Sequence, residues 1–168
     1  MTILILLSAS ESGKTTIAEA IASRGDAKVD VLHFDRIGVP PLHRMIAEHG
    51  SAEGVAARHD FRMDGQACQS PPPAIHILFE GQTRFRFAAE AAAAADMSNY
   101  VPILVDCDDE TRRHRLSVDR GQPELADQSM MDWARFLRDE ARTGGYDILD
   151  TSAQALATSV DAVSRHFD

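Results

Sequence analysis

Short apolar runs alternate with longer stretches of helical spacing along almost the whole chain. The apolar runs predict five strands, at residues 3–7, 29–33, 74–79, 101–105 and 148–149. The intervening stretches predict helices over residues 14–23, 40–66 with a break near 50–51, 84–95, 111–118, 123–142 and 153–167. A strand, a helix and a second strand in succession form a βαβ unit, whose strands are parallel and buried on both faces. The sequence therefore predicts a three-layer α/β/α protein built on a parallel sheet.

Length and composition are typical of one globular domain. The chain has 168 residues, of which 44% are hydrophobic and 26% are charged. Its net charge of −9 argues against the basic face that nucleic-acid binding requires. The first apolar run lacks the basic start of a signal peptide, and no run is long enough to span a bilayer. We expect one cytoplasmic domain over residues 1–168, a monomer or homodimer that binds neither nucleic acid nor membrane.

The cysteines and histidines give no pattern of a disulfide framework or a structural metal site. Cys68 and Cys107 lack the spacing of a paired-cysteine motif, and the seven histidines lack the short spacing that zinc sites use. The acidic balance also means that a small anionic ligand must be met by local groups. The residues that follow each strand are the places to look for them, because ligands of such sheets bind beyond the carboxyl ends of the strands.

The segment directly after the first strand matches a phosphate-binding loop. Residues 8–15 read Ser-Ala-Ser-Glu-Ser-Gly-Lys-Thr, against the P-loop pattern G-x-x-x-x-G-K-[ST]. Gly13, Lys14 and Thr15 match, and Ser8 replaces the first glycine, which matters only if that position needs a positive φ. The residues predicted to bind the nucleotide phosphates are Ser8, Ala9, Ser10, Glu11, Ser12, Gly13, Lys14, Thr15 and Thr16.

The chemistry of this loop depends on its backbone and on two side chains. Small residues let successive N–H groups curl around a phosphate, and the next helix presents its N-terminus to the anion. Lys14 is expected to reach the outer phosphates, and the Thr15 hydroxyl to ligate Mg²⁺. Only two of the 17 basic residues are lysines. A chance Gly-Lys-Thr at an ordinary helix start would leave the strand before it and the amphipathic helix after it unexplained.

The loop, the short chain and the arginine-rich segments late in the sequence resemble the P-loop kinases of nucleosides, nucleotides and small metabolites. Shikimate, gluconate and adenylate kinases belong to this group. The resemblance is specific at the loop and extends to the layout of the whole chain. It implies a five-stranded parallel sheet in the order 2-3-1-4-5, with ATP and Mg²⁺ as cofactors. It also implies an acceptor-binding helical insert, at residues 36–70, and an arginine-rich lid, at residues 108–142.

Two acidic residues follow predicted strands where these kinases place carboxylates. Asp35 is the expected catalytic base, because a neutral hydroxyl is a poor nucleophile and gains from a positioned base. Glu80 is expected to position Mg²⁺ or the acceptor, and the exchange of the two roles stays open. A carboxylate would repel a phosphate acceptor, so Asp35 favours a hydroxyl acceptor. The alternative for Asp35 is a loop cap paired with Arg36.

Arginines supply the remaining candidates. Arg44 and Arg84 are expected to bind the acceptor, although Arg44 could lie on a solvated helix face and Arg84 could pair with Glu80. After the fourth strand, Arg112, Arg115 and Arg120 resemble the lid arginines that stabilise charge on the moving phosphoryl group. An exposed helix of mixed charge is the alternative reading of that segment.

The sequence thus predicts an ATP-dependent phosphotransferase that moves the γ-phosphoryl group of ATP to a hydroxyl of a small-molecule acceptor. Two alternatives stay open. One is a nucleoside monophosphate kinase, and the other is a nucleotide-binding module without transfer activity. A GTPase is disfavoured, because neither of the two lysines lies in an Asn-Lys-x-Asp sequence.

Overall fold

Five parallel strands form a single sheet whose centre is the first strand. The structure is a computed structural model that describes residues 2–24, 29–33, 76–94 and 99–167. The strand order is β2-β3-β1-β4-β5, as the resemblance implied. The strands are β1 (Ile3–Leu7), β2 (Val29–His33), β3 (His76–Gly81), β4 (Tyr100–Asp106) and β5 (Asp147–Asp150).

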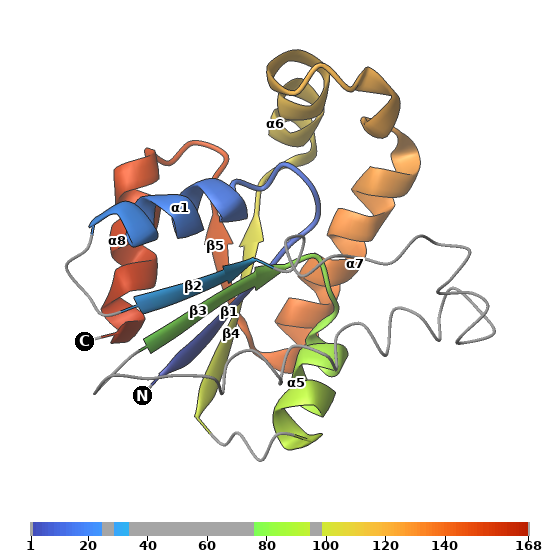
Figure 1. Ribbon diagram of the computed structural model, residues 1–168. Coiled ribbons are helices and arrows are strands. Elements are labelled where there is room, and N and C mark those ends of the chain that lie inside the picture. Colours follow the sequence, from blue (N-terminus) through green and yellow to red (C-terminus); the bar gives the residue numbers. More distant parts are fainter. Residues whose placement is uncertain (1, 25–28, 34–75, 95–98, 168) are drawn as a thin grey trace, which may run out of the picture.

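Helices cover both faces of the sheet (Figure 1). Helices α1 (Lys14–Arg24) and α8 (Leu156–Ser164) pack on one face, where they meet Leu4 and Leu6 of β1. Helices α5 (Phe85–Ala94) and α7 (Gln128–Gly144) pack on the other, against Ile3, Ile5 and Leu7. Alternate residues of a strand point to opposite faces, so a continuous apolar run gives β1 two buried faces. The predicted three-layer α/β/α architecture is confirmed.

The segment after β4 is more broken than its sequence pattern predicts. Helix α6 (Asp109–His114) is capped by Asp108 and passes into a π-helical turn, η3 (Arg115–Asp119), where one continuous helix was predicted. A 3-10 turn, η4 (Pro123–Leu125), precedes α7, and η5 (Arg165–Phe167) follows α8. Asp127 caps α7 by accepting a hydrogen bond from the Met130 N–H, which starts that helix after the predicted residue 123.

Strand β3 runs to Gly81, so Glu80 belongs to the strand and not to the loop after it. The predicted acceptor-binding insert, residues 36–70, lies outside the described residues. Among the described helices, none has the length and apolar character needed to cross a membrane.

We expect Leu4→Ala to lower the free energy of unfolding by about 2–5 kcal/mol, because it leaves a cavity between β1 and the α1/α8 layer. Denaturant unfolding followed by circular dichroism measures the change. The matched control is Val118→Ala, whose side chain is 65% exposed and whose truncation should leave stability nearly unchanged. Equal effects of the two variants would contradict the central position of β1.

Candidate active site

The carboxyl ends of the parallel strands bring the predicted loop and the predicted acidic residue together. Residues 8–13 connect β1 to α1, and Glu80 lies at the end of β3, which pairs with β1 in the sheet. Gln82, just beyond β3, donates a hydrogen bond from Nε2 to Ser10 Oγ at 3.0 Å. The loop is therefore bordered by β3 as well as by its own strand and helix.

Two residues of the loop, Glu11 and Gly13, adopt positive φ angles, of 58° and 89°. Ser8 does not, so the replacement of the first glycine of the pattern causes no left-handed strain at that position. Glu11 is the only non-glycine residue with positive φ in the described part of the chain, and such a conformation is costly for a residue with a Cβ atom. The backbone strain in this loop thus lies at Glu11, a position at which the sequence pattern does not predict it.

Glu80 is the meeting point of three elements. Its Oε2 lies 3.0 Å from Lys14 Nζ and accepts a hydrogen bond from Thr15 Oγ1 at 3.2 Å. Its Oε1 lies 2.8 Å from Nδ1 of His33, the last residue of β2. The Glu80 side chain is only 2% exposed, and a buried carboxylate requires such partners.

The charge of Glu80 is maintained by these neighbours. Burial raises the pKa of Glu80, but the Lys14 ammonium and hydrogen bonds from His33 and Lys14 outweigh that effect and hold the pKa below its ordinary value. Glu80 is therefore an anion in the folded protein at neutral pH. A carboxylate beside a threonine hydroxyl and a lysine ammonium is a set of groups suited to a phosphate with a divalent cation.

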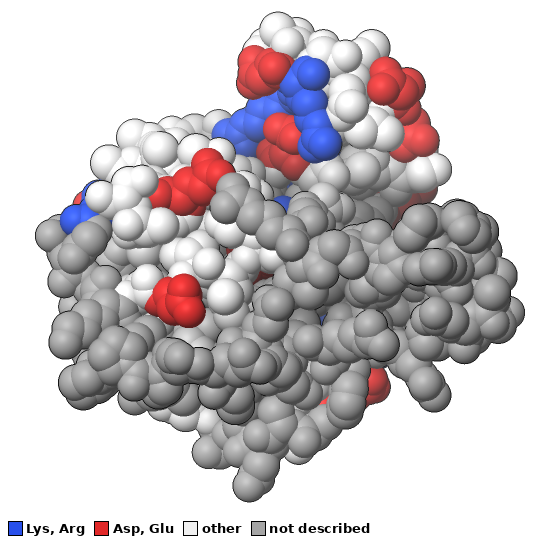
Figure 2. All heavy atoms as spheres, in the orientation of Figure 1, with Lys and Arg blue, Asp and Glu red and all other residues white. Residues whose placement is uncertain are grey.

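The three predicted lid arginines all contact the phosphate-binding loop. Arg115 Nη1 donates to the Glu11 carbonyl oxygen at 3.2 Å, and Arg120 Nη1 lies 2.8 Å from Glu11 Oε1. Arg112 Nη1 donates to the Ser10 carbonyl oxygen. Figure 2 shows that the largest group of basic side chains on the visible face lies near α6, next to acidic ones.

Arg112 differs from the other two because it has no exposed surface. Its Nη2 bonds to Asp106 Oδ1 at 2.7 Å and to the Cys107 carbonyl oxygen at 3.2 Å. Its guanidinium is therefore enclosed by protein groups, because the buried Asp106 carboxylate at the end of β4 needs a cation. The phosphate contact predicted for Arg112 from the sequence stays a prediction.

A cavity of about 350 Å³ opens beside the loop. Its walls come from the loop, the start of α1, η3, the segment after β5 and α8. The lining residues are Glu11, Gly13, Thr16, Ile17, Arg115, Asp119, Thr151, Gln154, Leu156 and Ser159. The loop and one predicted lid arginine thus share a pocket with polar and apolar walls.

The remaining predicted residues lie apart or outside the described structure. The Arg84 guanidinium carbon lies 5.5 Å from the ring centre of Trp133 and 4.9 Å from that of Phe136, so the side chain packs on α7. Arg84 is not among the described partners of Glu80, although pairing was one reading of its sequence position. Asp35 and Arg44 lie outside the described residues, and their roles stay predictions.

Sequence reasoning missed three side chains of this site. His33 contacts Glu80, Gln82 contacts Ser10, and the Thr151 hydroxyl donates to the Ser12 carbonyl oxygen at 2.7 Å. A search for polar residues at every strand end would have found His33, because it is the last residue of β2.

Comparison with known proteins finds similarity in structure but not in sequence. No protein-family model matches the chain, and no curated protein matches it in sequence. An unliganded sugar kinase from Janibacter sp. superposes with a TM-score of 0.68 at 14% identity, covering 100% of this chain and 95% of that one. A gluconokinase from Sinorhizobium meliloti gives 0.62 at 13% identity, with 99% and 91% coverage.

A thymidylate kinase from Candida albicans gives a TM-score of 0.65 at 10% identity, covering 99% of this chain and 93% of that one. The chain therefore has the P-loop kinase fold, with a five-stranded parallel sheet in the order 2-3-1-4-5. At this level of identity the superpositions establish the fold alone.

We expect Glu80→Gln to remove part of the pH dependence of stability. Because the pKa of Glu80 is lowered in the folded protein, its charge stabilises the fold above the ordinary pKa of 4.5. That contribution is lost as the pH falls through the lower pKa of the folded state. The melting temperature should fall less steeply between neutral and acidic pH for Glu80→Gln than for the wild type. The exposed Glu90, changed to Gln, serves as the control and should reproduce the wild-type curve.

Proposed function

We propose that the chain is an ATP-dependent phosphotransferase that moves the γ-phosphoryl group of ATP to a hydroxyl of a small-molecule acceptor. The observation that carries the proposal is the contact of Lys14 and Thr15 with the buried carboxylate of Glu80, at the mouth of a P-loop in a kinase fold. A chance Gly-Lys-Thr at a helix start gives no reason for a buried acid from the neighbouring strand to meet both side chains.

The loop supplies donors for the phosphate oxygens. Lys14 is the ammonium that would bind the outer phosphates, in exchange for part of its contact with Glu80. The hydroxyls of Ser8 and Ser12 are buried and have no hydrogen-bond partner among the described residues. A buried hydroxyl without a partner is unfavourable, and a phosphate oxygen would accept a hydrogen bond from each.

The residues present also fit Mg²⁺. This ion prefers oxygen ligands and is usually held by one or two protein groups together with phosphates and water. Thr15 Oγ1 and Glu80 Oε2, 3.2 Å apart, are such a pair. When bound, Mg²⁺ neutralises charge on the phosphates during transfer. Glu80 would hold the ion directly or position the acceptor, as the sequence suggested.

The cavity beside the loop suits the nucleoside part of ATP. It adjoins the loop at Glu11 and Gly13, so a ligand with phosphates in the loop extends into it. Arg115 and Gln154 offer donors and an acceptor, and Ile17 and Leu156 offer apolar contact. This division into a few polar groups and apolar walls is usual for small-molecule sites.

The acceptor would be activated by a carboxylate. Asp35 remains the proposed base, because a hydroxyl nucleophile must lose a proton as it attacks phosphorus. Glu80 would be the second carboxylate, which positions Mg²⁺ or the acceptor. Arg120, which is half-exposed and bound to Glu11, is the arginine best placed to exchange that contact for a phosphate oxygen. Closure of the segment that carries it would exclude water and limit hydrolysis of ATP.

A nucleoside monophosphate kinase is the second candidate. The thymidylate kinase among the structural neighbours favours it. The carboxylate of Asp35, as the proposed base beside the acceptor, opposes it, since an adjacent carboxylate would repel a phosphate acceptor.

We expect Lys14→Ala to reduce ATP-dependent transfer by about 10²–10³-fold, because it removes a charged donor to the phosphates. Steady-state ADP release with a saturating acceptor measures the loss. The matched control is Arg24→Ala, which removes a cation from the other end of the same helix, where it pairs with Asp161 on the surface. Transfer by Lys14→Ala at the wild-type rate would reject the mechanism.

We expect a screen of hydroxyl compounds to reveal the acceptor by ADP release above the background of hydrolysis. The panel contains sugars, sugar acids, cyclic hydroxy acids, nucleosides and hydroxyl-bearing antibiotics, with nucleoside monophosphates as a second group. Turnover with the monophosphates alone would replace the hydroxyl acceptor by the second candidate. ATP binding without turnover of any compound in either group would instead support a nucleotide-binding module.

A further inference from the structure

We propose that Arg112, Arg115 and Thr151 hold the carbonyl groups of the phosphate-binding loop from outside and thereby aim its N–H groups at the phosphates. We call these three side chains the carbonyl clamp. The proposal deepens the proposed function, on which it rests, by naming positioning residues for the phosphate site.

The clamp donates to three consecutive carbonyl oxygens. Arg112 Nη1 donates to that of Ser10, Arg115 Nη1 to that of Glu11 at 3.2 Å, and Thr151 Oγ1 to that of Ser12 at 2.7 Å. The donors come from α6, from η3 and from the segment after β5. An ordinary helix start does not require that donors from three separate segments each bind one carbonyl of the preceding loop.

The hydroxyl of Thr151 is itself oriented for this bond. Arg115 Nη1 donates to Thr151 Oγ1 at 3.1 Å, and Arg115 Nη2 donates to the Thr151 carbonyl oxygen at 2.8 Å. A hydroxyl has one hydrogen to donate. Because Arg115 occupies a lone pair of that oxygen, the hydrogen is directed to a carbonyl, and the Ser12 carbonyl is the nearer of the two within reach.

Peptide geometry converts bound carbonyls into aimed N–H groups. A peptide unit is planar and trans, so its C=O and the N–H of the next residue point in opposite directions. Carbonyls of residues 10–12 drawn toward the clamp turn the N–H groups of Glu11, Ser12 and Gly13 away from it. Within the described residues, no acceptor is paired with these three N–H groups. They form the kind of concave set that binds an anion.

The clamp also explains how Glu11 keeps its positive φ. A strained conformation persists where the surroundings determine it more than once. The Glu11 carbonyl oxygen accepts from Arg115 and lies 3.6 Å from the Cys107 thiol, while its carboxylate pairs with Arg120. The backbone carbonyl and the side-chain carboxylate of Glu11 are therefore both held by partners.

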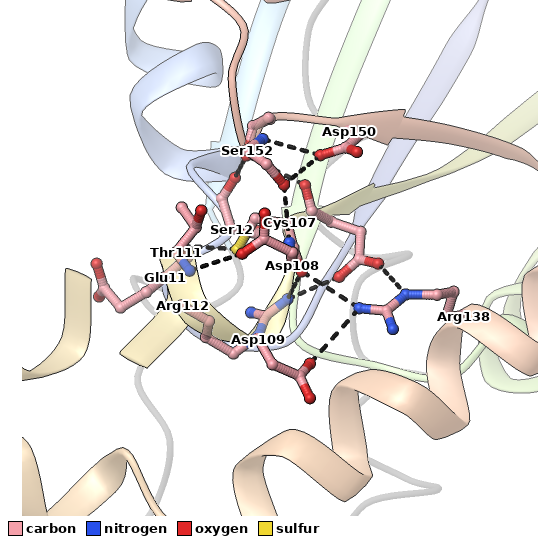
Figure 3. A network of polar contacts seen from close by, with 12 residues as sticks. Glu11, Ser12, Cys107, Asp108, Asp109, Thr111, Arg112, Arg138, Asp150 and Ser152 are labelled. Carbon is pink, nitrogen blue, oxygen red and sulfur yellow. Dashed lines mark hydrogen bonds and ion pairs between the residues drawn. The ribbon is translucent and has the colours of Figure 1, made fainter. Parts of the chain in front are cut away.

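Ion pairs and hydrogen bonds to Asp106 hold the base of the clamp. Figure 3 shows Arg112 and Arg138 converging on the end of β4 from α6 and α7. Arg112 bonds to Asp106 Oδ1 and Arg138 to Asp106 Oδ2, at 2.7 and 2.5 Å. The Thr151 N–H donates to the Asp106 carbonyl oxygen at 2.8 Å, which ties the segment after β5 to the same strand end.

Arg138 provides a matched control for Arg112. Both guanidinium groups bind Asp106, and both donate to the Cys107 carbonyl oxygen at 3.2 Å. Only Arg112 donates to the loop. A variant of Arg138 therefore perturbs the shared network without touching a loop carbonyl.

The first test compares Thr151→Val with Thr151→Ser by calorimetry of Mg²⁺-tripolyphosphate binding. The valine keeps the shape and loses the donor, so we expect its Kd to rise about tenfold, the effect of one lost hydrogen bond of this kind. The serine keeps the hydroxyl and should bind as the wild type does. Equal affinities of the two variants would overturn the proposal.

The second test compares Arg112→Met with Arg138→Gln in the same assay, with melting temperatures measured in parallel. We expect weaker tripolyphosphate binding for Arg112→Met alone, even if both variants melt earlier than the wild type. Equal weakening would show that Arg112 acts through Asp106 and would overturn its part in the clamp. If Arg112→Met does not fold, the pair of Thr151 variants decides the matter alone.

Tripolyphosphate separates this proposal from the proposed function. Wild-type protein that binds it and shows the expected variant pattern, yet phosphorylates no acceptor, would support the clamp and reject the kinase. Wild-type protein that does not bind it would overturn both, because a clamp that aims N–H groups at phosphates requires a loop that binds them.

Discussion

The site depends on a single buried carboxylate. Glu80 lies at the junction of β3 and the phosphate-binding loop, almost without solvent, and its charge must be compensated there. Lys14, Thr15 and His33 provide the compensation from α1 and β2. The interaction thus fixes how three elements of the sheet edge are placed, and it does so with the groups that a nucleotide and a metal ion would use. The contacts of Glu80 that stabilise the fold therefore involve the same side chains that would bind the ligand.

Sequence reasoning reached the fold and the loop because both rest on local patterns. The apolar run of β1 is buried on both faces, and Gly13-Lys14-Thr15 follows it after a short loop, where the next helix begins. The strand order could not be derived from periodicity. It came from the resemblance, since nothing in an isolated strand states which neighbour it pairs with.

The parts of the site that were missed depend on contacts between distant segments. An arginine on a predicted surface helix is ordinarily solvated, and Arg112 is buried only because Asp106 and the Ser10 carbonyl lie beneath it. A glutamate has no preference for positive φ, so the conformation of Glu11 comes from its partners. The π-helical turn at η3, which carries Arg115, likewise has no simple sequence pattern, although such turns often occur at functional sites.

These tertiary contacts explain how an acidic chain can form a site for a polyanion. A protein of net charge −9 offers a phosphate no long-range attraction, so the affinity of the proposed site must come from short-range donors held in place. In the proposed clamp, arginines bind the loop carbonyls on the side away from the ligand. Arg112 there donates to the Ser10 carbonyl oxygen and also pairs with Asp106. The inside is left to N–H groups, to the Ser8 and Ser12 hydroxyls and to one ammonium. Under the two proposals, the one described lysine supplies a compact charge that faces the ligand, and the arginines supply planar donors that shape the loop around it.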